Sequence, residues 1–505
     1  MATTSPPAPQ AEPKGAGLQG GVLTLKNCLA LSAAVMAPVL AVILNAPAAG
    51  ASAGKALPIA FLLAFIAALL VGNTVIEFAK RLPSAGSFYT FCSRSLGSRA
   101  GFFTGWLYFA AFVLLTVGLF TANGAFLHSY LKSTFGLDVP FLILGLIIIA
   151  IAMTLSVRSI RTSVRLDLIL LGLEMFIFTL LAVICIVRAG SGNSLSYFDP
   201  TASPTGLSGL GLGIVFGLLS FIGFEAAATL GEETGDAKRN VPLAVRGSLL
   251  GVGVFFVLVL YGLAAGFHLN TAGGLKSFLD SPAAFSSLAD RYASFLKQPV
   301  ELAAVAGLFS CLLAVLNTTV RVVYAMAREG VLPTRLSRVH PRFRSPDVAI
   351  YALVAFSVVI GIITSAWIGT SLTDVYGFTG SLGTVAIVLV YVLANIGLMK
   401  FYWKQPDFNA LRHLVLPAIG TVILLYPLYE VAKPGQAFPY NLVLYGVLAW
   451  VILGFVVYGY LQKSAPEKLA ALGATMATDE IDFALAKDPS LSTGRLQRGV
   501  APDRL

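Results

Sequence analysis

The side chains in this sequence that could carry out chemistry are a few carboxyl groups placed inside long apolar runs. Glu174 stands in the middle of one run, eight residues after Leu166 and thirteen before Val187. Glu225 closes the segment Phe-Ile-Gly-Phe-Glu in a second run. A carboxyl group in such a setting is costly when charged, and it typically takes up a proton, binds a cation or contacts a charged solute. The sequence therefore points to ion and solute binding.

The sequence contains no cluster of side chains that could catalyse a reaction. Metal or nucleophilic catalysis needs histidine, cysteine or aspartate side chains grouped at one depth, and the cysteines and histidines here are dispersed without a C-x-x-C pair. These residues are Cys28, Cys92, Cys185, Cys311, His128, His268, His340 and His413. The sequence also lacks a phosphate-binding Gly-Lys-Ser/Thr loop. We therefore expect no catalytic residue, no metal site and no cofactor.

The elements that must position these carboxyl groups are apolar helices. Of the 505 residues, 57% are apolar and 11% are charged, whereas soluble domains carry about 25% charged residues. A helix that crosses a membrane needs roughly 20 mostly apolar residues, and we find twelve such runs. They cover residues 25–46, 57–79, 101–127, 139–157, 166–187, 208–230, 246–268, 300–324, 348–368, 375–399, 411–431 and 440–461. Because the runs are continuous rather than alternating, the sequence predicts an all-α polytopic membrane protein.

Lysine and arginine are distributed unevenly between the loops. If the N-terminus is cytoplasmic, the cytoplasmic loops carry nineteen basic residues and the opposite loops carry seven. Cytoplasmic loops are enriched in Lys and Arg, so we predict that both termini are cytoplasmic. The net charge of +10 then reflects topology beside anionic lipid, and we expect no nucleic-acid partner. We predict a disordered tail at 1–21, a twelve-span domain at 22–462 and a cytoplasmic tail at 463–505.

Two of the predicted spans contain an interruption near the middle. The first span reads Ser-Ala-Ala-Val-Met-Ala-Pro over residues 32–38, and Pro38 removes a backbone hydrogen bond. The sixth span places Gly223 beside Glu225, which is costly in a continuous membrane helix. Unpaired backbone is tolerated in a membrane only where it lines a protein cavity. The two breaks therefore predict a central site that offers N–H groups to an anion and carbonyl groups to a cation.

Three collinear segments resemble the amino acid–polyamine–organocation (APC) permeases. These segments are residues 83–106, 221–242 and 317–346, which resemble the second-to-third span region, the sixth-span signature, and the eighth span with its following loop. The resemblance runs from about residue 22 to 462. It implies a permease domain with a 5+5 inverted-repeat fold like that of the leucine-transporter group, in which spans eleven and twelve lie outside the repeats.

The resemblance also implies which residues hold the substrate. The unwound parts of spans one and six would bind its charged ends. Ser32, Ala33, Ala34, Val35, Met36 and Ala37 would lie on the carboxylate side, and Phe221, Ile222, Gly223 and Phe224 would supply carbonyls for the ammonium group and an aromatic gate. Glu225 is predicted either to cap the inner half of span six or to contact the ammonium group. Tyr376 and Phe378 in span ten would form an outer gate.

Ion coupling is predicted at Glu174 in the fifth span. Some proton-coupled members of the resembling family carry a lysine near this point, in place of a bound sodium ion. We therefore predict that Glu174 takes up the coupling proton or helps to bind sodium. Thr318 and Thr319 in the eighth span are candidates for additional oxygen ligands.

Together these features predict a secondary active transporter of the plasma membrane that moves an amino acid by alternating access, coupled to protons or sodium ions. Many members of the resembling family carry two glycines in the first break, and this chain carries none. An amine substrate such as a polyamine or ethanolamine is therefore an alternative. A channel is disfavoured because no repeated filter element is visible, and a membrane-embedded enzyme because no catalytic cluster is present. The partners expected are the substrate, the coupling ion and the lipid bilayer; the sequence does not predict an oligomeric state.

Overall fold

The computed structural model describes residues 18, 20–368, 374–433, 436, 438–470 and 472. These residues form helices joined by short loops, without a β-strand apart from an isolated parallel bridge between Leu23 and Thr234. A helix satisfies its backbone hydrogen bonds internally, which is what a chain of this composition requires in lipid. The predicted tails at 1–21 and 463–505 lie mostly outside the described residues.

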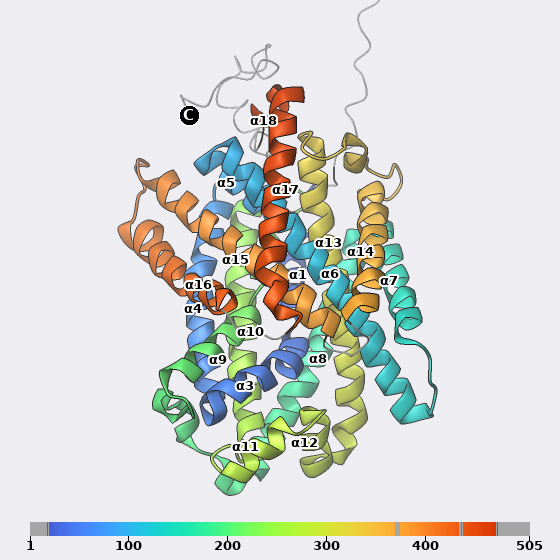
Figure 1. Cartoon of the computed structure of the whole chain (residues 1–505), viewed down its shortest axis with the longest axis vertical. Coiled ribbons are helices and arrows are strands. Elements are labelled where there is room, and N and C mark those ends of the chain that lie inside the picture. The colour runs from blue at the N-terminus through green and yellow to red at the C-terminus, as the bar shows by residue number, and fades with distance from the viewer. Residues whose placement is uncertain are drawn as a thin grey trace, which may run out of the picture.

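The helices follow the apolar runs of the sequence (Figure 1). In chain order the α-helices are α1 (Leu25–Val35), α2 (Pro38–Leu40), α3 (Ala46–Ala53), α4 (Leu57–Ala79), α5 (Phe88–Leu96), α6 (Ser98–Phe135), α7 (Phe141–Arg158), α8 (Ile160–Arg188), α9 (Leu207–Leu219), α10 (Ala237–Phe267), α11 (Ala272–Leu279), α12 (Ala284–Tyr292), α13 (Lys297–Arg328), α14 (Asp347–Ile368), α15 (Asp374–Tyr402), α16 (Leu416–Ala432), α17 (Val443–Ser464) and α18 (Pro466–Ala470). Segments Ala41–Asn45 and Leu411–Val415 are π-helical. Gly54–Ala56, Gly190–Gly192, Leu195–Phe198, Pro200–Ala202, Phe224–Leu230, Ser294–Leu296, Thr334–Ser337 and Tyr440–Leu442 are 3₁₀-helical.

Eleven helical stretches of the described chain are long and apolar enough to cross a membrane. The first, Leu25–Ala79, is 55 residues long and contains two of the predicted spans, 25–46 and 57–79. The other stretches each correspond to one predicted span. The all-α polytopic class is therefore confirmed, whereas the number twelve and the 5+5 repeat stay predictions.

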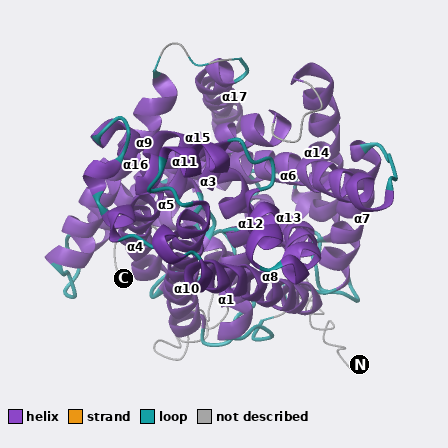
Figure 2. Ribbon diagram, turned by 90° about the horizontal axis from the view of Figure 1, so that it is seen from below, coloured by secondary structure: helices purple, strands orange, loops and turns teal. Residues whose placement is uncertain are grey.

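The helices are arranged with lipid-facing elements around a packed centre. α1 packs against α8 and α10, and α6 packs against α13 and α15; Figure 2 shows α1 beside α8 and α10 in the end view. α7 and α14 lie at the outer edge of the bundle (Figures 1 and 2). They expose large apolar side chains such as Ile151 and Ile363. Exposed apolar surface of this extent is typical of helices that face lipid.

The loops that the sequence predicts to share one side of the membrane do lie at one end of the bundle. Arg81 pairs with Asp407 at 2.5 Å, which joins the loops after spans two and ten. Ser345 Oγ donates to the carbonyl of Val157 at 2.6 Å, which joins the loops after spans eight and four. We call this end, which carries most of the arginines, the basic end.

Candidate functional site

The first span is interrupted between α1 and α2. We call Met36 and Ala37, which separate the two helices, the first break. Ala37 has a φ of 47°, a left-handed conformation that costs an L-residue roughly 1–2 kcal/mol. Such strain persists only where the surrounding structure fixes it, and both residues of the break are buried.

The sixth span is interrupted between α9 and the 3₁₀ helix Phe224–Leu230. We call Ser220–Gly223 the second break. Gly223 has a φ of 105°, which glycine adopts without a steric cost. A Cβ atom at this position would lie only 2.9 Å from Val35 Cβ and 3.0 Å from the Val35 carbonyl carbon. Gly223 therefore lets the second break pack directly against the last residue of α1, next to the first break.

Ser32 links the two broken spans through its hydroxyl group. The Oγ atom donates to the Phe224 carbonyl at 2.8 Å and accepts from the Ala227 N–H at 2.8 Å. The side chain is fully buried. In this conformation the Ser32 hydroxyl joins α1 to the inner half of span six instead of pointing at a substrate.

Ser32→Ala is expected to weaken the contact between the two broken spans. The change removes two hydrogen bonds that the buried Phe224 carbonyl and Ala227 N–H make outside their own 3₁₀ helix, each worth about 0.5–1.5 kcal/mol. We expect a lower thermal unfolding midpoint in detergent and slower substrate uptake, with both partly restored in Ser32→Thr. Ser464→Ala is the matched control, because its exposed hydroxyl bonds only the Tyr460 carbonyl. An unchanged midpoint in Ser32→Ala would contradict the linking role.

A cavity of about 710 Å³ ends at the two breaks. Val35, Met36 and Ala37 line it from the first span, and Ile222 lines it from the second break. Its walls continue along α9 and α15 to Ser52, at the end of the bundle opposite the basic end. None of the described residues that line the cavity belongs to the basic end, so the cavity extends from the breaks toward the opposite end of the bundle.

The other predicted substrate residues are buried around the breaks and do not line this cavity. They are Ser32, Ala33, Ala34, Phe221, Gly223, Phe224 and Glu225. They shape and join the breaks in this conformation, and their contact with substrate stays a prediction.

Three backbone carbonyls at the breaks are free to bind a cation. Met36, Ser220 and Ile222 all line the cavity, and none of their carbonyl oxygens accepts a hydrogen bond from the described residues. An unpaired carbonyl away from water is costly unless something binds it. An ammonium group in the cavity would supply up to three donors, so these carbonyls suit a primary amine.

Glu225 is held by the backbone and by a tyrosine. Its Oε2 atom accepts from the Gly223 N–H at 3.1 Å and from the Tyr391 hydroxyl at 2.8 Å. The carboxyl group thereby caps the start of the 3₁₀ helix, as carboxylates do at helix N-termini. The rings of Phe224 and Tyr391 lie 5.4 Å apart, and Tyr108 is buried nearby. Glu225 therefore joins the start of the 3₁₀ helix to Tyr391 of α15.

Glu174 lies behind the first break, together with a second buried acid, Asp167. The two residues are seven positions apart on α8, and so they lie on the same face of this helix. Asp167 Oδ1 accepts from Ser310 Oγ of α13 at 3.3 Å, and Glu174 packs against Gly307 of α13. One oxygen of each carboxyl group is buried with no hydrogen-bond partner among the described residues. Neither acid lines the cavity.

Thr318 and Thr319 do not join this acidic pair. Their hydroxyls donate to the carbonyls of Ala314 and Val315 in their own helix, at 2.9 and 2.7 Å. They lie roughly two helical turns along α13 from Ser310. Their predicted ligand role is not supported by a contact with Glu174, and it stays a prediction.

The two residues predicted as an outer gate have different surroundings. Tyr376 lines the cavity and packs against Gly118 of α6. Phe378 instead packs with Val385 and Val443 and meets the edge of Trp367. The segment around them is part of the continuous helix α15, so only Tyr376 is placed to meet a solute in this conformation.

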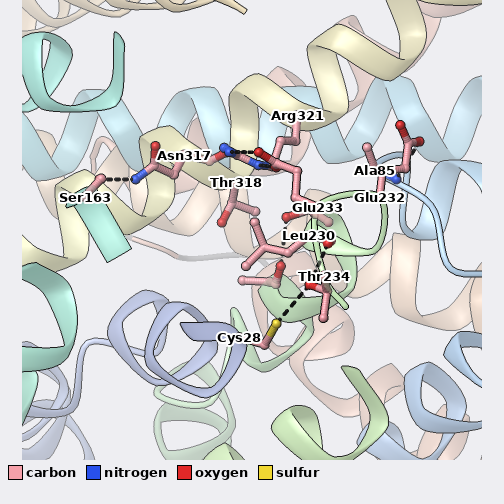
Figure 3. Close-up of polar contacts among 12 residues, drawn as sticks. Cys28, Ala85, Ser163, Leu230, Glu232, Glu233, Thr234, Asn317, Thr318 and Arg321 are labelled. Atoms are coloured by element: carbon pink, nitrogen blue, oxygen red, sulfur yellow. Dashed lines mark hydrogen bonds and ion pairs between the residues drawn. The ribbon is translucent and has the colours of Figure 1, made fainter. Parts of the chain in front are cut away.

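Between the breaks and the basic end, a buried ion pair joins two elements of the bundle (Figure 3). Arg321 of α13 binds Glu233 through Nε at 2.5 Å and Nη2 at 3.2 Å, and its Nη1 donates to the Asn317 carbonyl at 2.7 Å. Both side chains are almost fully buried. Cys28 lies next to Thr234, with 3.1 Å between Sγ and Oγ1. The ion pair therefore ties α13 to the loop that follows span six.

A second group of contacts extends this closure. Arg328 binds Glu232 with two hydrogen bonds of 2.8 Å, and Glu232 also accepts from the Ala85 N–H at 3.1 Å. Leu23 donates through its N–H to the Glu233 carbonyl at 3.0 Å. Together with Arg321–Glu233, these contacts form what we call the basic-end seal.

Glu233→Gln is expected to open the basic-end seal. Loss of one partner of a buried ion pair costs about 3–5 kcal/mol, and each 1.4 kcal/mol changes a population roughly tenfold. In a variant where Cys28 is the sole cysteine, we expect a polar thiol reagent to label this buried residue at least about ten times faster. Asp138→Asn, which breaks the exposed pair with Lys132, is the control. Equal labelling rates in the two variants would show that the pair does not close this end.

The sequence reasoning missed several of these residues. Tyr391 stands in an ordinary apolar run, and Asp167 lies close to a predicted span end, where a charged residue is common. A heptad spacing between Asp167 and Glu174 was available as a signal, because two acids seven residues apart share a helix face. Arg321 and Glu233 lie far apart in the sequence, and only the fold brings them together.

Comparisons with known proteins agree with this architecture. A family model described as amino acid permease matches residues 23–461. The branched-chain amino acid permease BcaP of Bacillus subtilis is 24% identical over 409 residues, covering 78% of this chain and 82% of the relative. The methylthioribose transporter of Bacillus subtilis is 24% identical over 418 residues, with coverage of 78% and 82%. Cationic amino acid transporter 7, chloroplastic, of Arabidopsis thaliana is 26% identical over 398 residues, with coverage of 73% and 64%.

The family model covers nearly the whole span region, including both breaks and the basic-end seal. These similar proteins are a permease and two transporters. The resemblance to the APC permeases is therefore confirmed, and the chain belongs to the amino acid permease family.

Proposed function

We propose that this protein is a secondary active transporter that moves an amino acid across the plasma membrane by alternating access. One observation carries the proposal. The cavity of about 710 Å³ is lined by residues of both broken helices, among them Met36, Ser220 and Ile222, whose carbonyl oxygens accept no backbone hydrogen bond from the described residues. A transported solute needs a binding site near the middle of the membrane, and broken helices provide one.

The basic end faces the cytoplasm in this proposal. The support is the excess of Lys and Arg in its loops. The cavity then opens to the outside while the basic-end seal closes the inside, as expected for an outward-facing carrier. Inward release requires the seal to part while the outer walls of the cavity approach one another.

The coupling ion is assigned to Glu174 and Asp167. Two buried carboxyl groups with unpaired oxygens cannot both stay charged without compensation. A bound proton or a sodium ion would supply that compensation. Glu174 packs against Gly307, whose position also faces Val39 just after the first break. We therefore expect that binding of a proton or a sodium ion to this pair changes the shape of the first break.

The proposal is tested with purified protein in liposomes. Unlabelled amino acid trapped inside is expected to accelerate entry of labelled amino acid, because a carrier returns faster when loaded. Uptake is then compared with an imposed proton gradient, a sodium gradient or neither. A solute flux without counterflow would indicate a channel, and an absence of amino acid flux in all conditions would contradict the proposal.

An amine such as a polyamine or ethanolamine is the second candidate substrate, because the unpaired carbonyls bind an ammonium group whether or not a carboxylate accompanies it. Putrescine, spermidine and ethanolamine are therefore included as trapped solutes in the same assay. Counterflow with these amines and none with amino acids would favour the second candidate.

A further inference from the structure

The charges around the cavity restrict the substrate that it accepts. Among the described residues that line it, the one charged side chain is Glu430. Glu430 already binds Lys433 at 2.6 Å. It lies near the C-terminal end of α16, away from the breaks. The rest of the lining is apolar or carries hydroxyl, amide and thiol groups. The cavity therefore has no spare carboxylate at the depth of the breaks.

The nearby buried acids do not alter this charge count. Glu225 binds the Gly223 N–H and Tyr391 and does not line the cavity. Asp167 and Glu174 lie behind the first break, where α8 meets α13. A second cationic group on the substrate would therefore enter a low-dielectric space without a partner, which costs several kcal/mol.

Part of the cavity wall is apolar and is supplied by three helices. Leu119 of α6, Cys311 and Val315 of α13, and Val388 of α15 all line the cavity, and each is mostly covered by neighbouring atoms. Ile222 completes this group from the second break. Each methylene group buried against such a wall contributes about 0.8 kcal/mol. The wall therefore favours an aliphatic or aromatic substituent next to the ammonium group.

We propose that the cavity selects amino acids with an uncharged, apolar side chain and rejects cationic amino acids and polyamines. This inference rests on the proposed transport function, because it assigns the substrate class of the same site. The α-amino group binds the free carbonyls of the two breaks. The apolar side chain lies against Leu119, Val315 and Val388.

The test is competition in the liposome counterflow assay. Leucine, isoleucine, valine, methionine and phenylalanine are expected to compete with the labelled substrate. Lysine, arginine, glutamate and putrescine at equal concentration are expected not to compete. Effective competition by lysine or arginine would overturn the substrate class while leaving amino acid transport intact. Absence of counterflow with every amino acid would instead contradict the transport function itself.

Two variants examine the wall directly. Val315→Asp places a carboxylate in the apolar wall and is expected to weaken leucine competition at least about tenfold, a change of 1.4 kcal/mol, while admitting lysine. Val315→Thr, which keeps the shape without the charge, is the matched control and the fallback if Val315→Asp does not fold. Because the threonine hydroxyl is polar, Val315→Thr is expected to lower leucine affinity without admitting lysine. If Val315→Asp folds and still prefers leucine to lysine as the natural sequence does, the assignment of this wall is wrong. If Val315→Asp does not fold, unchanged competition by leucine in Val315→Thr would overturn the assignment instead.

Discussion

Gly223→Ala is expected to abolish most transport while the protein still inserts into the membrane. The new methyl group would meet Val35, because an ideal Cβ lies 2.9 Å from Val35 Cβ and overlaps its Cγ1. Overpacking of this kind costs roughly 1–3 kcal/mol. The φ of 105° adds strain of about 1–2 kcal/mol for an L-residue. The two breaks are therefore expected to separate, with loss of the carbonyl arrangement that faces the cavity.

The measurement is the initial rate of counterflow per reconstituted molecule, with a fall of at least about tenfold expected. Gly251→Ala is the matched control, because a Cβ there meets nothing within 4 Å and alanine favours a helix more than glycine does. We expect the control to transport normally. Normal transport by Gly223→Ala would mean that contact between the breaks is not needed for the transport cycle.

Glu174→Gln is expected to remove ion-driven accumulation while exchange of substrate continues. The amide is close to the shape of the carboxyl group but cannot bind or release a proton. The variant should therefore bring its substrate only to equal concentrations on both sides, whatever gradient is imposed. Counterflow is expected to remain, because the cavity residues are unchanged and Glu174 does not line it.

Two further variants test whether the coupling effect belongs to the buried acidic pair. Asp167→Asn is expected to weaken the same coupling, because its carboxyl group belongs to the same buried pair. Glu301→Gln, at a partly exposed position near the start of the same helix α13, is the control. Uphill accumulation by Glu174→Gln at the rate of the natural sequence, with the same dependence on protons and sodium, would exclude the coupling role.

The fold was largely predictable because the membrane imposes one rule on the backbone. Apolar runs of sufficient length must become helices, and α4 at Leu57–Ala79 coincides with its predicted span. The breaks were also predictable, since Pro38 and Gly223 cannot support a regular helix without cost. The helical connection between spans one and two was not anticipated. It arises because residues 46–56 continue as short helical turns between the two spans.

The side-chain contacts of the site were less predictable. Ser32 was expected to face the substrate, yet its hydroxyl binds Phe224 and Ala227. A serine hydroxyl can serve either purpose, and only the distance between two helices decides which one it serves. The pair Arg321–Glu233 joins residues 88 positions apart. Neither residue type nor spacing indicates such a pairing, because the arginine was equally suited to the membrane surface.

The basic-end seal has a consequence for the speed of the cycle. Leu23, Arg321 and Arg328 are held by adjacent residues of one short loop, Glu232 and Glu233. In the proposed cycle these contacts are lost together when that loop moves, and we therefore expect a barrier with a large enthalpic part. Turnover should accordingly rise steeply on warming, and the passive leak of solute through the resting protein should be small.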